Sequence, residues 1–156
     1  MPILNYTTEI DVHKTVGEIQ RALAKAGVIA VSVDYDGKGE PMALMFLIKF
    51  HEEVVNFRLP SRWEGVLKHL YSDPKVPRSF KTETQARRVA WRIVKDWVEA
   101  QMAIIEAGQA EIVEVFLPYA VTNSGQSLYQ VFNSSQKLLQ AGAPSARAPG
   151  AGENHD

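Results

Sequence analysis

The chain has 156 residues, of which 46% are hydrophobic and 22% charged, and its formal net charge is −1. This composition predicts one ordinary globular domain, and the absence of cysteine excludes disulfides, cysteine-ligated metals and thiol catalysis. No apolar run has the length of a membrane span and the first residues lack a secretory pattern, so we expect a soluble protein of the cytoplasm.

The spacing of apolar residues changes several times over the first 60 positions. Residues 3–7 predict a short strand, and helical spacing over 11–26 predicts a helix that Gly27 ends. Alternation over 28–35, and again over 43–50 and 53–59, predicts three further strands, of which the first two form a hairpin around a glycine-rich turn. The outer face of this sheet is more apolar than a solvated face, so we expect a later helix or a second subunit to cover it.

The rest of the chain is predominantly helical in pattern. Ser61 with Glu64 fits a capping box for a helix that ends before Pro74, and Thr82 with Gln85 fits a second one. The second box opens a long helix at about 82–107, whose apolar stripe comprises Ala86, Val89, Ala90, Ile93, Val94, Trp97, Ala100 and Ile104. Short helical or irregular pieces are expected at 109–117 and 125–140. We therefore predict a single α+β domain over 1–140, with a small, mainly antiparallel sheet at about 3–60, and a disordered tail over 141–156.

Charge is segregated along the chain. Residues 58–95 contain ten Lys or Arg and three Asp or Glu, whereas residues 96–136 contain five acidic residues and no basic one. The long helix thus has a basic first half and an acidic second half, which is the reverse of the order that its dipole favours. This order indicates a role in binding rather than in helix stability.

The basic half of the long helix is the candidate site. Arg88, Arg92 and Lys95 share the face opposite the apolar stripe, and a tryptophan at the edge of that stripe is placed to stack on a base or ring. The residues of this predicted strip, which would hold phosphates, are Arg78, Lys81, Arg87, Arg88, Trp91, Arg92 and Lys95. The alternative is a solvated face, because Arg92 with Asp96 and Lys95 with Glu99 have the spacing of intrahelical ion pairs.

Other chemistry has weaker support in the sequence. The four histidines are scattered without metal-ligand spacing, and Asp34, Asp36 and Glu40 are explained by turn chemistry beside glycines. The chain contains no serine nucleophile motif, no phosphate loop and no dinucleotide fingerprint. We expect no cofactor, no metal site and no catalytic residue.

Several segments resemble a family of small proteins found in bacteriophages and prophages. They are ILNYTT at residues 3–8, the helix at 12–27, RVAWRIVKDWVEAQM at 88–102, FLPY at 116–119 and LY at 128–129. The resemblance implies a virus-derived accessory protein that acts inside a bacterium, and it assigns no activity and no functional residue.

Two functions are consistent with these features. The first is a non-enzymatic protein that binds nucleic acid or a phosphorylated nucleotide through the basic strip. The alternative is a protein-binding inhibitor or assembly factor, including a counter-defence protein, that docks on a host or phage protein through the apolar sheet face or the bipolar helix. An enzyme with an unfamiliar site is a third interpretation. In each case we expect a homodimer, because the two oppositely charged halves of the long helix suit antiparallel pairing and the partly apolar second sheet face offers another surface for twofold pairing.

Overall fold

Two tight turns fold the chain into a three-stranded sheet. In the computed structural model, which describes residues 2–135, the strands are β1 (Ala30–Tyr35), β2 (Pro41–Phe50) and β3 (Glu53–Pro60), antiparallel and in that order. Val33 lies opposite Leu44, and Phe46 lies opposite Phe57. Alternate residues therefore present one apolar face. The predicted α+β class and mainly antiparallel sheet are confirmed.

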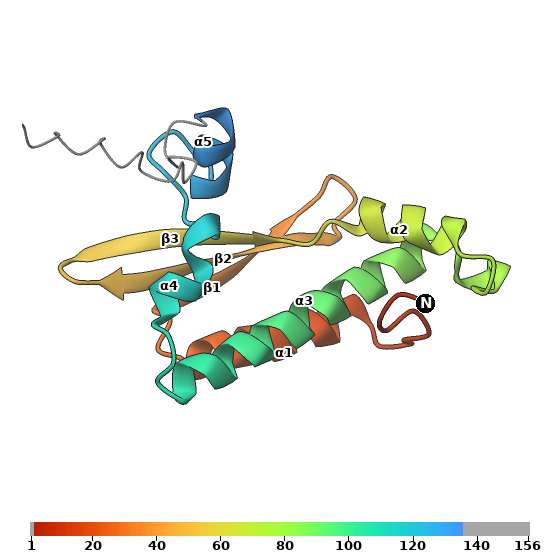
Figure 1. The fold of residues 1–156 in the computed structure, drawn as a ribbon, viewed down its shortest axis with the longest axis horizontal. Coiled ribbons are helices and arrows are strands. Elements are labelled where there is room, and N and C mark those ends of the chain that lie inside the picture. The colour runs from red at the N-terminus through yellow and green to blue at the C-terminus, as the bar shows by residue number, and fades with distance from the viewer. Residues whose placement is uncertain (1, 136–156) are drawn as a thin grey trace, which may run out of the picture.

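Two long helices cover that apolar face. α1 (Val12–Lys25) and α3 (Glu83–Glu106) lie side by side along it (Figure 1). The main core between helices and sheet includes Ile19, Leu23, Leu44, Phe46, Phe57, Trp91, Val98 and Phe116. Both helices appear where the apolar spacing predicts them, so the long helix as the spine of the second half is confirmed.

A second, smaller core surrounds the first half of α3. α2 (Trp63–Ser72) and the short η1 (Arg78–Phe80) pack there, around the buried side chains of Leu70, Val76 and Ala86. Because α3 is covered by the sheet and α1 on one side and by α2 on another, more than one stripe of it is buried. Ala100, assigned to the predicted stripe, is exposed, whereas Trp91 and Val98 are buried.

The last described elements return to the sheet. α4 (Ile112–Phe116) and η2 (Leu117–Tyr119) lead to α5 (Leu128–Ser134), which Figure 1 shows on the opposite side of the sheet from α1 and α3. These helices confirm the predicted short helical pieces as far as Ser135. The predicted tail over 141–156 and the last five residues of the predicted 1–140 domain lie outside the described residues.

The predicted strand at residues 3–7 is wrong. This segment is a turn in which Asn5 has φ +63°, a left-handed conformation that a strand does not contain. Asn5 Nδ2 donates to Asp96 Oδ2 at 2.7 Å, and Gln85 Nε2 donates to the carbonyl oxygens of Tyr6 and Thr8. The segment is therefore held against α3 rather than paired in the sheet.

Neither of the two predicted capping boxes forms completely. Thr82 accepts a hydrogen bond from the Gln85 backbone N–H as predicted, but the Gln85 side chain reaches the N-terminal turn instead of closing the box. The Ser61 capping box is wrong, since α2 starts one residue later with Arg62 in the cap position and no side-chain cap. The Ser61 hydroxyl is buried without a hydrogen-bond partner among the described residues.

Candidate functional site

The predicted basic strip is largely neutralised by neighbouring acids. Arg92 Nη1 lies 2.8 Å from Glu18 Oε2 on α1, and Lys95 Nζ lies 3.8 Å from the same oxygen and 2.8 Å from Glu99 Oε1. The two basic side chains are only 13% and 15% exposed. They face α1 rather than solvent, which corrects their predicted position on an open face.

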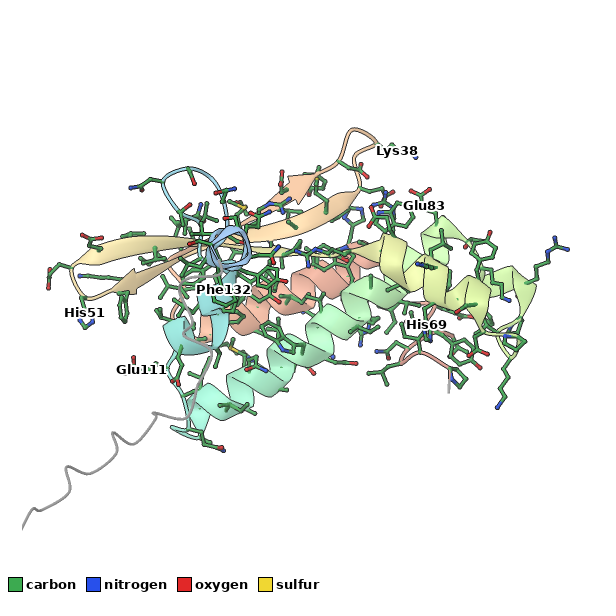
Figure 2. All side chains as sticks on the ribbon, turned by 45° about the horizontal axis from the view of Figure 1, so that its top comes forward. Lys38, His51, His69, Glu83, Glu111 and Phe132 are labelled. Carbon is green, nitrogen blue, oxygen red and sulfur yellow. The ribbon has the colours of Figure 1, made fainter. Side chains whose placement is uncertain are left out.

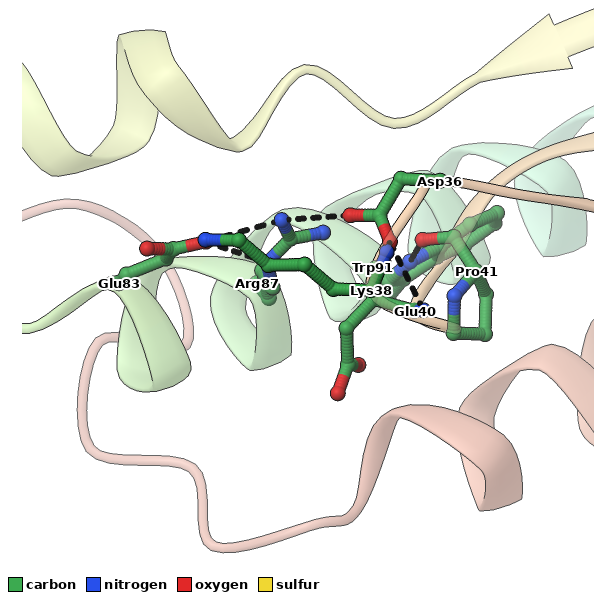
Figure 3. A network of polar contacts seen from close by, with 7 residues as sticks. All are labelled: Asp36, Lys38, Glu40, Pro41, Glu83, Arg87 and Trp91. Carbon is green, nitrogen blue, oxygen red and sulfur yellow. Dashed lines mark hydrogen bonds and ion pairs between the residues drawn. The ribbon is translucent and has the colours of Figure 1, made fainter.

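Arg87 belongs to a second network, at the start of α3 (Figure 3). Its guanidinium donates to Asp36 Oδ2 and Glu83 Oε1, each at 2.9 Å, and its Cζ lies 4.7 Å from the centre of the Trp63 ring. Figure 2 shows Lys38, at the tip of the β1–β2 hairpin, near Glu83, and its Nζ lies 3.8 Å from Glu83 Oε1. Arg87 thus joins the hairpin, α2 and α3, and its buried charge is not free for a phosphate.

The charges of this network stabilise one another. Backbone N–H groups of Glu40 and Lys38 donate to Asp36 Oδ1, and with the Arg87 guanidinium they lower the pKa of Asp36 below its ordinary 3.8. Burial opposes the charge of Arg87, but its hydrogen bonds to Glu83 and Asp36 outweigh burial and raise its pKa. Both groups are therefore held in their charged forms.

The remaining strip residues do not form a continuous surface. Trp91 is 1% exposed and its indole N–H donates to the Pro41 carbonyl at 3.2 Å, so its predicted role as a stacking platform is wrong. Lys81 Nζ donates to the Tyr71 carbonyl at 3.5 Å. Arg78 and Arg88 have no ion pair among the described residues, but they are separated by the turn that carries Lys81 and by the first residues of α3.

A different cationic site lies on the other side of the sheet. A hollow of about 470 Å³ opens between the end of β3 and α5, and we call it the Arg58–Arg62 hollow. The side chains that matter for binding in its lining are those of Arg58, Arg62, Tyr119, Ser127, Tyr129 and Gln130. The lining, which lies wholly within the described residues, contains no Asp, Glu or His.

The chain builds this hollow by bringing a distant segment to the edge of β3. Ala120 forms a β-bridge with Phe57, and the Val121 N–H donates to the Asn56 carbonyl at 2.8 Å. A turn then reverses the chain at Gly125, whose φ of +82° is a conformation that glycine adopts without strain. Ser127 bridges back to Val121 and caps α5, so the wall carrying Tyr129 is attached to the sheet.

Two anchored side chains set the chemistry of the hollow. Arg58 Nη2 donates to Asp34 Oδ2 at 3.0 Å, and this ion pair positions the guanidinium on the sheet. A guanidinium has five N–H donors, and the others of Arg58 have no protein acceptor among residues 2–135. The Tyr119 ring contacts Trp97 edge to face, with centroids 5.8 Å apart. Arg62 and Tyr129 are exposed. The arrangement combines guanidinium donors for an anion with aromatic rings for a planar group.

Sequence reasoning missed these residues for an identifiable reason. Arg58 and Arg62 open the basic block of residues 58–95, so the sequence contains the charge signal, but helical spacing groups only the later basic residues of that block on one face. Nothing in the sequence places Tyr119 beside Arg58, because the bridge between Phe57 and Ala120 is a long-range pairing.

Searches for other sites and for relatives give negative results. Residues 2–135 contain no group of three or more His, Asp or Glu side chains placed to hold a metal ion, and no helix among them is long and apolar enough to cross a membrane. No protein-family model matches the chain, and neither curated proteins nor solved structures give a match.

Proposed function

We propose that this protein is a non-enzymatic binding protein that holds a phosphorylated nucleotide, or the end of a single-stranded nucleic acid, in the Arg58–Arg62 hollow. One observation carries the proposal: two arginines and two tyrosines line a hollow of about 470 Å³ whose lining has no carboxylate. The size falls within the range of about 300–1,000 Å³ that is usual for small-molecule sites.

The chemistry of the lining matches the two parts of a nucleotide. A guanidinium binds phosphate oxygens through paired N–H donors. Arg58 is already paired with Asp34, whereas Arg62 has no ion pair among the described residues, so Arg62 supplies the charge that is free for the ligand. A tyrosine ring can stack on a base irrespective of its identity. The lining offers no carboxylate or imidazole as a general base, so the proposal is binding and not catalysis.

The ion pairs of α3 favour a small ligand over a long nucleic acid. Binding along a duplex requires a row of free cationic side chains. These neutralise successive phosphates, and the nucleic acid then releases the counterions that were condensed on them. Arg87, Arg92 and Lys95 are engaged by Asp36, Glu83, Glu18 and Glu99. The hollow instead places Arg62, which has no ion pair among the described residues, close to Arg58, which is paired with Asp34. The proposal therefore keeps the ligand class expected from the sequence and moves its site.

The biological setting is part of the proposal. The resemblance to bacteriophage and prophage proteins implies a virus-derived accessory protein in the host bacterial cytoplasm. A nucleotide binder in that setting would withhold or sense a phosphorylated signal without consuming it.

One observation favours protein docking as the second candidate. The outer face of the sheet is apolar along Met45, Leu47 and Val54, and Val54 is 57% exposed. The described residues cover this face only at the β3 edge, near α5. A host or phage protein that docks there would be the partner if no nucleotide binds.

Isothermal titration calorimetry of the full chain tests the first candidate. The ligands are AMP, ATP and a single-stranded oligonucleotide of about four nucleotides, a length that one stacking site accommodates. Arg62→Gln should weaken binding about tenfold or more, because a hydrogen bond to a charged group contributes roughly 1.5–3 kcal/mol. Arg78→Gln is the matched control, since both residues are exposed and neither has an ion pair among the described residues. An equal loss in the two variants, or no binding by the wild type, would contradict the proposal.

A further inference from the structure

The helical layer carries an apolar groove on the side of the molecule opposite the Arg58–Arg62 hollow. It has a volume of about 470 Å³ and lies between α1 and the second half of α3. Its apolar lining consists of Ala22, Ala26, Met102 and Ile105, all of them half-buried. The two helices lie side by side here (Figure 1), and among residues 2–135 the lining of the groove comes from these two helices and the cap residue Ala26.

The two walls of the groove carry opposite charges. Arg21 and Lys25 line it from α1, together with Glu18, whose carboxylate is already paired with Arg92 and Lys95. Glu99 and Glu106 line it from α3. The four charged lining residues other than Glu18 are exposed. Within residues 2–135, Arg21, Lys25 and Glu106 form no ion pair, and Glu99 pairs only with Lys95 on its own helix. The opposite charges therefore face outward on separate walls instead of neutralising each other across the groove.

Such a surface is complementary to itself. α1 and α3 run in the same direction, since Thr84 and Asp11 meet at their first turns and Glu106 and Lys25 meet at their last. A twofold axis parallel to the two helices places α1 of one copy opposite α3 of the other. Because the axis is parallel to the helices, each residue keeps its position along the helix direction. The axis therefore places the basic wall of one copy opposite the acidic wall of the other, twice in the same interface.

We propose that this groove is the interface of a homodimer, in which a second copy of the chain is the occupant. The four apolar residues of each floor meet at the centre, and Arg21 and Lys25 pair with Glu99 and Glu106 of the second copy. This geometry differs from the antiparallel pairing of long helices expected from the sequence, because Arg92 and Lys95 in the positive half of α3 are already paired with Glu18, and Arg87 is paired with Asp36 and Glu83. The dimer goes beyond the proposed nucleotide binding and leaves the hollow free, since the two sites lie on opposite sides of the sheet.

A charge-swap experiment tests this interface. Sedimentation equilibrium of the full chain should give twice the chain mass of 17.4 kDa. Arg21→Glu with Lys25→Glu makes both walls acidic, and Glu99→Lys with Glu106→Lys makes both basic. Each double variant should weaken self-association about tenfold or more, because like charges then face each other twice.

The mixture of the two double variants decides the question. The acidic wall of one then faces the basic wall of the other at both contacts, so an equimolar mixture should form a heterodimer. This rescue also shows that both variants are folded. A monomeric wild type, double variants that dimerise as strongly as the wild type, or a mixture that stays monomeric would each overturn the proposal. Nucleotide affinity of either double variant should be unchanged, which separates this test from that of the hollow.

Discussion

Arg92 Nη1 lies 2.8 Å from Glu18 Oε2, across the contact between α3 and α1. The same carboxylate lies 3.8 Å from Lys95 Nζ, and Arg92 also donates to Thr15 Oγ1 at 3.4 Å. One acidic side chain on α1 thus neutralises two of the basic residues that the sequence presents as a binding strip. The pairing has consequences for stability that can be measured.

Glu18→Gln should lower the free energy of unfolding by about 1.5–3 kcal/mol, the usual contribution of a hydrogen bond to a charged group. The cause is that Arg92 and Lys95 lose their shared counter-charge in a setting where they are 13% and 15% exposed. Urea unfolding of the variant measures this loss. Glu52→Gln, at an exposed turn between β2 and β3, is the control and should be neutral. Equal stability of the two variants would show that the pair does not stabilise the helix contact.

Trp91→Ala should cost about 3–5 kcal/mol, the range for truncating a buried large aromatic side chain. Trp91 is 1% exposed between α3 and the sheet, and its indole N–H donates to the Pro41 carbonyl. Trp91→Phe keeps much of the ring volume and loses that hydrogen bond, so it should cost less than the alanine change. Denaturant midpoints of the two variants measure the difference, and an unchanged midpoint for Trp91→Ala would mean that the indole is not in the core.

Asp36→Asn should reduce stability at neutral pH and make it less sensitive to acid. The pKa of Asp36 is lowered in the folded chain, chiefly by the backbone N–H of Glu40 and also by Lys38 and Arg87. Because the unfolded chain binds this proton more readily, the contribution is complete above the ordinary pKa of 3.8 and is lost as pH falls through the lower folded value. Thermal unfolding of wild type and variant from pH 7 to pH 2 should therefore give curves that converge in acid. Parallel curves would contradict the role of Asp36.

Local patterns in the sequence predict most of the fold. The period of two over β2 and β3 and the helical spacing in α1 and α3 each reflect burial of one face, so the elements appear where expected. Local spacing fails at residues 3–7, where it predicts a strand and the chain forms a turn. Its polar contacts come from Gln85 and Asp96, which are far away in sequence, and they favour a turn at Asn5.

The site was harder to predict than the fold because charge pairing is a tertiary property. The acid that neutralises Arg92 lies 74 residues earlier in the chain, and a helical wheel of α3 does not contain it. A helical wheel of α3 also contains one apolar stripe and puts Trp91 at its edge, whereas the fold buries several faces of α3, including the one that carries Trp91. The composition of the basic block predicts a cationic site but not its place, because only the bridge between Phe57 and Ala120 brings Tyr119 into the same hollow as Arg58 and Arg62.

The most direct test of nucleotide binding in the hollow is a nuclear magnetic resonance titration of the ¹⁵N-labelled chain with AMP. It resolves the arginine Nε–Hε signals separately from the backbone amides. The arginines whose signals shift on titration are therefore the ones that contact the phosphate. We predict that the largest changes occur at the side chains of Arg58 and Arg62 and at the backbone amides of Gly125 and Tyr129, which line the hollow. Changes concentrated at Arg78 and Arg88, or no change at millimolar AMP, would contradict the assignment of the site.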